Sequence, residues 1–75
     1  MEITLSKAKN AKLKVIKING GRNMIAKLYS MGIYEGVDIE KLVSYSKGPV
    51  VIKVLNSQIA IGHNMAEKIV VKEMN

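Results

Sequence analysis

The side chains best suited to chemistry in this chain of 75 residues are one histidine and a few carboxylates. His63 stands close to Met65 and Glu67, and Asp38 lies two residues before Glu40, so these groups could offer nitrogen, sulfur and oxygen ligands to a metal ion. Selective transition-metal sites usually gather about three or four imidazole, thiolate or carboxylate groups, and the chain has no cysteine. We therefore expect a surface or capping histidine and no resident cofactor, with a bound transition-metal ion as the open alternative.

No arrangement typical of catalysis can be recognised. The sequence has no Cys–His pair, no glycine-rich phosphate-binding loop and no Gly-x-Ser-x-Gly nucleophile elbow. Lys41 and the serines would need an orienting partner, which the sequence does not show. The dipeptides Gly20-Gly21 and Gly48-Pro49 are typical of turns. We therefore expect a binding protein and not an enzyme.

Positive charge is concentrated in the first third of the chain. The formal net charge is +6, and residues 1–27 contain Glu2 as their only acidic residue, whereas residues 28–75 carry equal numbers of acidic and basic residues. Such asymmetry can mark a contact with nucleic acid, anionic lipid or an acidic partner. However, three tyrosines are the only aromatic residues and Arg22 is the only arginine, so base stacking and bidentate base recognition have little support. Nucleic acid is not the expected partner, and a small basic nucleic-acid-binding barrel remains an alternative.

Length and composition indicate one small domain over residues 1–75. A hydrophobic fraction of 48% suffices for one core. No apolar run approaches the roughly 18–20 residues that span a bilayer, and residues 1–7 lack an apolar stretch of signal-peptide length. The absence of cysteine allows a reducing compartment. We expect a cytoplasmic domain without membrane insertion, and the sequence leaves its oligomeric state open.

Residues 23–31 are predicted to form the one clear α-helix. Asn23 can cap the first turn, because its side chain can accept a hydrogen bond from an unpaired backbone N–H. Gly32 follows where a left-handed residue commonly ends a helix. An apolar stripe at helical spacing is expected to be mainly core, and it consists of Met24, Ile25, Leu28 and Met31. Tyr29 falls outside this stripe.

Five short strands are predicted around the helix, at residues 13–19, 37–45, 50–55, 58–61 and 69–72. Single helical turns are expected at 4–9 and 62–67. Asp38 and Glu40 alternate with apolar residues and should point outward, whereas the apolar run 50–55 should be buried on both faces. A short, strongly bent sheet hides its edges by curling. We therefore expect a mainly β fold, a small and partly open barrel with the helix covering one mouth.

Several short motifs occur in a familiar order. The run Leu28-Tyr29-Ser30-Met31-Gly32-Ile33-Tyr34-Glu35-Gly36 matches a signature of Leu, two residues, Met-Gly-hydrophobic, two residues and Gly. Downstream come Gly48-Pro49-Val50, then Ile59-Ala60-Ile61-Gly62, and then Ala66, Ile69 and Val71. In this order and spacing, from Leu5 to Lys72, the chain resembles the FeoA family, ferrous iron transport protein A.

This resemblance implies a five-stranded SH3-like barrel that acts in the cytoplasm as a non-catalytic accessory of FeoB, the membrane ferrous iron transporter with a cytosolic GTP-binding part. Lys27 stands where the family often has arginine, which weakens any role for an arginine acting on GTP and leaves only Arg22 for it. Tyr34 stands where proline is common, so the turn is less rigid. The same barrel occurs in iron- and manganese-dependent repressors, so a metal-responsive regulatory domain is the alternative.

The expected partner-binding surface is a groove beside the helix. It should be rimmed by the turn after the helix and by the loop 47–49, and methionine and tyrosine suit such a surface. Its expected residues are Met24, Tyr29, Met31, Tyr34, Lys47, Gly48 and Pro49. Because aromatic residues are few, a helix or apolar loop of the partner is expected there instead of a proline-rich peptide.

Overall fold

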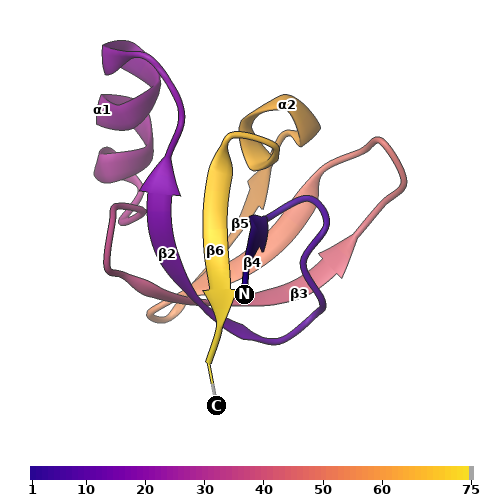
Figure 1. The fold of residues 1–75 in the computed structure, drawn as a ribbon. Helices are drawn as coiled ribbons and strands as arrows, with labels where there is room; N and C mark the ends of the chain where they lie inside the picture. Colours follow the sequence, from indigo (N-terminus) through magenta and orange to yellow (C-terminus); the bar gives the residue numbers. More distant parts are fainter. Residues whose placement is uncertain (75) are drawn as a thin grey trace.

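Six antiparallel strands form one strongly curved sheet in the computed structural model, which describes residues 1–74 (Figure 1). The elements are β1 (Glu2–Thr4), β2 (Lys12–Ile18), α1 (Arg22–Ser30), β3 (Asp38–Ser44), β4 (Val50–Val54), β5 (Ser57–Ile61), α2 (His63–Ala66) and β6 (Ile69–Glu73). The strand order is β1-β6-β2-β3-β4-β5. Strand β6 thus lies between β1 and β2 and pairs with both of them. The expected mainly β fold is confirmed.

The structure has six strands where the sequence indicated five. The additional strand is β1, whose three residues are too few to show a hydrophobic period. Its partner lies at the far end of the chain, where Ile3 stands opposite Val71. The helical turn expected at 4–9 begins where β1 ends, because the N–H groups of Lys7 and Ala8 both donate to the Thr4 carbonyl oxygen at 3.0 Å. The turn expected at 62–67 forms as α2.

Helix α1 contacts the barrel through one narrow side. The expected cap at Asn23 is wrong, since Gly21 occupies the N-cap with extended backbone and no side-chain hydrogen bond. Gly32 ends the helix as expected, with a φ of +87°. Of the apolar stripe only Leu28 is buried, Met24 and Met31 are half-buried against the core, and Ile25 is exposed. The stripe is therefore much less buried than the helical period suggested.

The core fills the inside of the curved sheet. Its largest fully buried side chains are Leu5, Leu13, Leu28, Ile33, Ile52, Ile61 and Ile69. Strand β4 contributes only one face to it, because Val50, Ile52 and Val54 are buried while Lys53 is exposed. The expected burial of residues 50–55 on both faces is wrong, since the outer face of β4 borders an open groove.

One charged residue lies inside the barrel. Lys41 on β3 is only 2% exposed, and its Nζ donates hydrogen bonds to three backbone carbonyl oxygens. The acceptors are those of Leu5 at 2.9 Å, Ser6 at 3.3 Å and Ala8 at 2.6 Å, all in the turn after β1. Burial lowers the pKa of Lys41, because desolvation disfavours its charged form. Lys41 thus ties the turn to the middle of the sheet.

Candidate partner-binding surface

The outward side of α1 carries an exposed, largely apolar stripe. Arg22, Ile25, Ala26 and Tyr29 follow the spacing that places residues on one helix face, and all four are exposed. Ile25 is 43% exposed and Tyr29 is 66% exposed. No acidic residue lies in the first turn of the helix. The stripe therefore combines apolar contact area with a single positive charge.

A pair of tyrosines extends this stripe into the next turn. The ring centroids of Tyr29 and Tyr34 are 5.5 Å apart, with their planes tilted by 50°, which is a favourable arrangement for two aromatic rings. The turn is fixed from below, because Ile33 is fully buried and its N–H donates to the Leu28 carbonyl at 2.9 Å. Gly36, with a φ of +94°, then returns the chain to β2 through a hydrogen bond to Val15. The two rings are thus held at the surface by a rigid support.

Leu55 is an exposed leucine in an unfavourable backbone conformation. It is 85% exposed, and its φ of +55° lies in the left-handed region, which costs a residue other than glycine about 1–2 kcal/mol. Leu55 begins the two-residue turn between β4 and β5. This turn lies beside the end of α1, because the preceding residue, Val54, approaches Gly32 so closely that a Cβ on Gly32 would lie 3.4 Å from Val54 Cγ1. Folding alone does not account for leucine here. We call the exposed side formed by Ile25, Tyr29, Tyr34 and Leu55 the helix-side surface.

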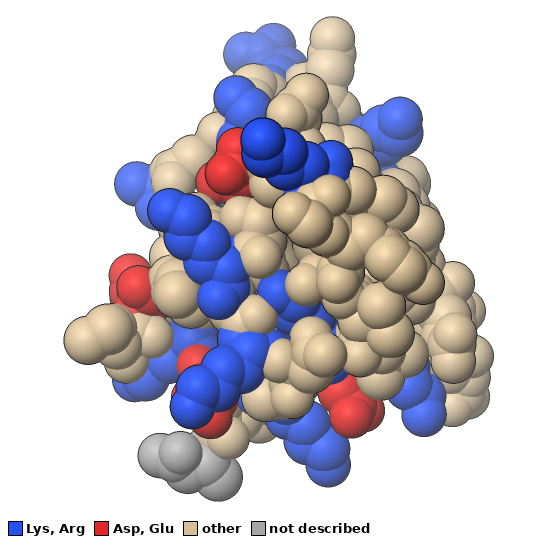
Figure 2. Space-filling model, turned by 90° about the vertical axis from the view of Figure 1, so that its right-hand side faces the viewer, with Lys and Arg blue, Asp and Glu red and all other residues tan. Residues whose placement is uncertain are grey.

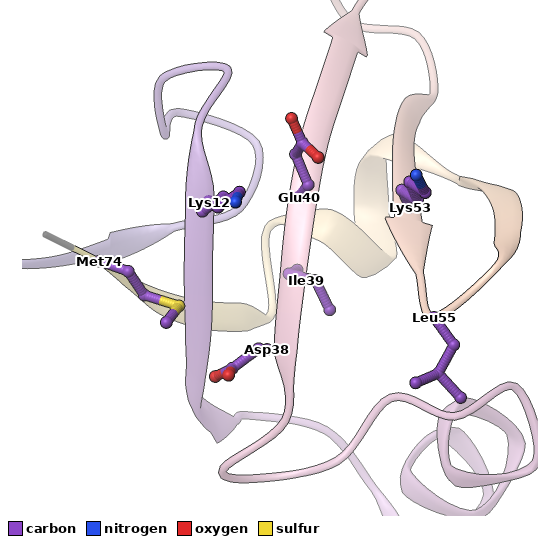
Figure 3. Close-up of a pocket in the computed structure, with 7 residues that line it drawn as sticks. All are labelled: Lys12, Asp38, Ile39, Glu40, Lys53, Leu55 and Met74. Carbon is purple, nitrogen blue, oxygen red and sulfur yellow. The ribbon is translucent and has the colours of Figure 1, made fainter.

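A groove of about 340 Å³ adjoins the helix-side surface at Leu55 (Figure 3). Its floor is the outer face of three strands, where Lys12, Glu40 and Lys53 stand directly opposite one another. Asp38, Ile39, Leu55 and Met74 complete the lining. The groove therefore presents alternating charges bounded by two apolar side chains.

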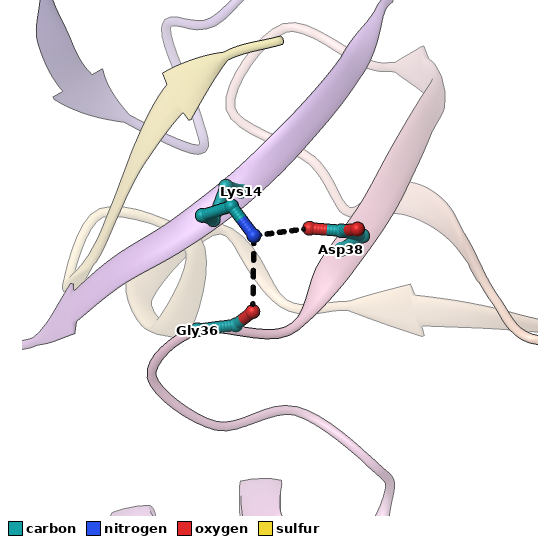
Figure 4. A network of polar contacts seen from close by, with 3 residues as sticks. All are labelled: Lys14, Gly36 and Asp38. Carbon is teal, nitrogen blue, oxygen red and sulfur yellow. Dashed lines mark hydrogen bonds and ion pairs between the residues drawn. The ribbon is translucent and has the colours of Figure 1, made fainter.

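The carboxylate of Asp38 is already engaged. Lys14 Nζ donates to Asp38 Oδ1 at 2.7 Å and to the Gly36 carbonyl oxygen at 3.4 Å (Figure 4). Glu40 lies on the same strand face between two lysines on the neighbouring strands. Both carboxylates are thus on the outer face of the sheet, as the alternation predicted.

The seven residues expected in one groove lie on two separate surfaces. Tyr29 and Tyr34 belong to the helix-side surface, and Met24 and Met31 support it from the half-buried side of the helix. The turn with Lys47, Gly48 and Pro49 precedes β4, whereas α1 lies near the last residue of that strand. The turn and the helix are therefore separated by the length of β4, about 13 Å, and Figure 1 draws them on opposite sides of the barrel. The groove that both were expected to rim is not formed.

Two residues of the helix-side surface were not expected there. The apolar helical period predicts that Ile25 is a core residue, and the apolar run 50–55 predicts the same for Leu55. The turn between β4 and β5 consists of Leu55 and Asn56, one residue earlier than the connection at 56–57 that the predicted strands imply. The sequence does not indicate that these two side chains are exposed, because their exposure depends on which other elements pack against them.

His63 has one carboxylate neighbour. Its Nε2 lies 3.6 Å from Glu67 Oε1, one helical turn away, and Met65 is half-buried against the core. Within residues 1–74, no three His, Asp or Glu side chains are grouped so that they could hold a metal ion. On the face drawn in Figure 2, Lys and Arg are dispersed with Asp and Glu among them, without forming a continuous basic strip.

The helices of the described part of the chain are also too short to cross a membrane. Neither α1 nor α2 combines the length and the apolar character of a membrane span.

Comparisons with known proteins agree on one family. The family model described as the FeoA domain matches residues 3–73. A protein of Methanocaldococcus jannaschii named putative Fe(2+) transport protein A is 41% identical over 59 residues, which cover 79% of this chain and 71% of that protein. The crystal structure of an iron uptake regulatory protein, FeoA, superposes with a TM-score of 0.91 at 36% identity, over 99% of this chain and 100% of the other.

A more distant likeness concerns the fold alone. The structure of ScaR with bound Zn2+ superposes with a TM-score of 0.87 at 18% identity. The match covers 96% of this chain but only 37% of ScaR. The barrel thus also occurs as part of a larger protein.

Proposed function

This chain belongs to the FeoA family, and on that premise we propose that it is a non-catalytic accessory protein of ferrous iron uptake. The family match over residues 3–73 and the relative named for Fe(2+) transport support this role. The family resemblance and the SH3-like fold expected from the motifs are both confirmed.

The partner in this proposal is the cytosolic GTP-binding part of the membrane transporter FeoB, met on the cytoplasmic side. The observation that carries the proposal is the helix-side surface, where Tyr29 and Leu55 are 66% and 85% exposed. Large apolar residues that are exposed together commonly mark a protein contact, and rigid aromatic side chains lose little entropy on binding. Leu55 adds to this, because its conformation is unfavourable for the isolated fold. We therefore assign docking to this side of the barrel.

Charge suggests what the docking segment looks like. Arg22 lies on the same exposed helix face as Ile25 and Tyr29, and no acidic residue lies in the first turn. A partner segment with an apolar side chain over the tyrosines and a carboxylate near Arg22 would complement this face. A partner that also reached Lys47, Gly48 and Pro49 would have to extend along β4.

The non-catalytic role is supported by the environment of Lys41. Its ammonium group has three backbone carbonyl oxygens as partners. A lysine that donates all its protons to carbonyl groups holds a structure together. Regulation would then act by binding, because a protein can shift a partner's conformational equilibrium only by binding one state more tightly than another.

Titration of the purified domain against the soluble GTP-binding region of the transporter tests the proposal. Binding is to be measured with GTP analogue, with GDP and without nucleotide, and we expect one state to bind more tightly. Tyr29→Ala and Leu55→Asn should each weaken binding about tenfold or more, as expected for contact residues at the centre of an interface.

Tyr45→Ala is the matched control. Tyr45 is a third exposed tyrosine, at 60%, and it lies at the β3–β4 turn. Its replacement should leave binding unchanged. A loss with Tyr45→Ala but not with Tyr29→Ala would place docking at the β3–β4 turn instead, and no binding in any nucleotide state would refute the proposed partner.

A metal-responsive regulatory function is the other candidate. It rests on the likeness to ScaR with bound Zn2+, whose 18% identity establishes the fold and nothing more. His63 with Glu67 would be its starting point. Ferrous iron affinity that is unchanged in His63→Ala would exclude this histidine as a ligand.

A further inference from the structure

Strand β5 forms an uncovered edge of the sheet. The strand order places β5 last, with β4 as its only neighbour among the described strands. Successive residues of β4 direct their backbone hydrogen bonds alternately to β3 and to β5. Tyr45 N–H donates to the Pro49 carbonyl at 3.2 Å, so Val51, two residues further on, also bonds to β3. Val50, Ile52 and Val54 then bond to β5. The same alternation directs the backbone N–H and C=O groups of Gln58 and Ala60 away from β4.

Charge does not protect this edge. Natural edge strands are commonly shielded by lysine, by proline, by a bulge or by being very short. The other edge, β1, has three residues and includes Glu2. By contrast, β5 has five residues and a regular register with β4. Between Lys53 and Glu67 the sequence contains no Asp, Glu, Lys or Arg, although 24% of the chain is charged. The uncharged stretch of the sequence thus coincides with the open edge.

We propose that β5 pairs antiparallel with β5 of a second copy, about a two-fold axis at Ile59. In this register Gln58 of each copy stands opposite Ala60 of the other. Each such pair exchanges two backbone hydrogen bonds, so four bonds form between groups that β4 leaves free. The result is a homodimer with one continuous sheet through both barrels, and the inference does not depend on the proposed transporter contact.

The chemistry of the strand favours a second copy as its occupant. Two copies with a net charge of +6 repel each other over most of their surfaces, and β5 is where they can approach without a charged residue on either pairing strand. Ile59 faces Ile59 of the second copy at the axis, where side chains of a non-hydrogen-bonded pair lie close together.

Sedimentation velocity of the full chain tests the pairing. From about 10 µM to about 1 mM, we expect the mass to rise from 8.3 kDa towards twice that value. Ala60→Pro removes an N–H that has no partner within one copy, and proline is tolerated at such positions of edge strands. This variant should stay monomeric at every concentration and keep the β-sheet circular dichroism spectrum and the cooperative melting of the wild type.

Two charged double variants test the register. Gln58→Lys with Ala60→Lys places like charges opposite each other twice, and it should weaken the dimer about tenfold or more. Gln58→Lys with Ala60→Glu places opposite charges in the same two positions and should restore dimerisation. Both side chains are exposed, and the new lysine opposite Lys53 of the same copy is common to the two variants, so the comparison between them isolates the charge at residue 60. A wild type that stays monomeric at about 1 mM, a dimer that persists in Ala60→Pro, or two double variants that behave alike would each overturn the proposal.

Discussion

Replacing Lys41 by methionine is expected to destabilise the fold by about 2–4 kcal/mol. Methionine keeps an unbranched apolar stem of similar length but removes the donors to the carbonyl groups of Leu5, Ser6 and Ala8. A hydrogen bond to a charged group contributes about 1.5–3 kcal/mol, and a buried acceptor left without a donor costs about 1–3 kcal/mol. Part of this loss is offset, because the variant no longer desolvates an ammonium group. A domain of this size is stable by only about 4–11 kcal/mol, so the effect is large.

Thermal and urea unfolding followed by circular dichroism measure the effect. The transition should fall by roughly 10–30 °C, since about 1 kcal/mol corresponds to about 4–8 °C in a domain of this length. Lys53→Met is the matched control, because Lys53 lies exposed on the adjacent strand opposite Glu40, and it should change stability by less than about 0.5 kcal/mol. A Lys41→Met variant as stable as the wild type would refute the reasoning, since desolvation of the ammonium would then outweigh its three hydrogen bonds.

Three further predictions concern stability. Burial lowers the pKa of Lys41 below its ordinary 10.5, so the unfolded state binds this proton more tightly than the folded state does. The free energy of unfolding should therefore rise as the pH approaches 10.5. Urea titrations should show that rise in the wild type and not in Lys41→Met. Leu28→Ala should cost about 2–5 kcal/mol, because Leu28 is fully buried, whereas Ile25→Ala on the exposed helix face should cost less than about 1 kcal/mol; equal losses would contradict the described packing of α1. Leu55→Asn should raise stability by up to about 1 kcal/mol, since asparagine tolerates a positive φ better, and a lower melting temperature would contradict this.

The fold could be predicted from the sequence wherever a periodic pattern extends over several residues. Strands β2 to β6 follow from alternation and turn residues, and the end of α1 follows from Gly32. Strand β1 could not be predicted, because its three residues acquire their structure from β6 at the other end of the chain. The cap of α1 could not be predicted, because the helix already begins at Arg22. Gly21 is therefore the extended N-cap residue, and Asn23 lies inside the first turn.

The candidate surface was only partly predictable, for a different reason. Tyr29 and Tyr34 were expected there because they fall outside the apolar period, but Ile25 and Leu55 look like core residues in the sequence. Exposure depends on which elements meet, and α1 meets the barrel mainly through Leu28. Likewise, strand alternation points Lys41 inward, yet its partners are 33 to 36 residues away in the chain.

The pairing of β1 with β6 has a consequence for folding during synthesis on the ribosome. Glu2 stands opposite Lys72, and Leu5 N–H donates to the Ile69 carbonyl at 2.8 Å, so β1 pairs with a strand that is synthesised more than 60 residues later. Contacts between such remote segments form slowly, because closing a long loop loses chain entropy before the new contacts stabilise the fold. During synthesis β1 therefore has no strand partner until β6 has emerged from the ribosome, and only then can this side of the sheet form.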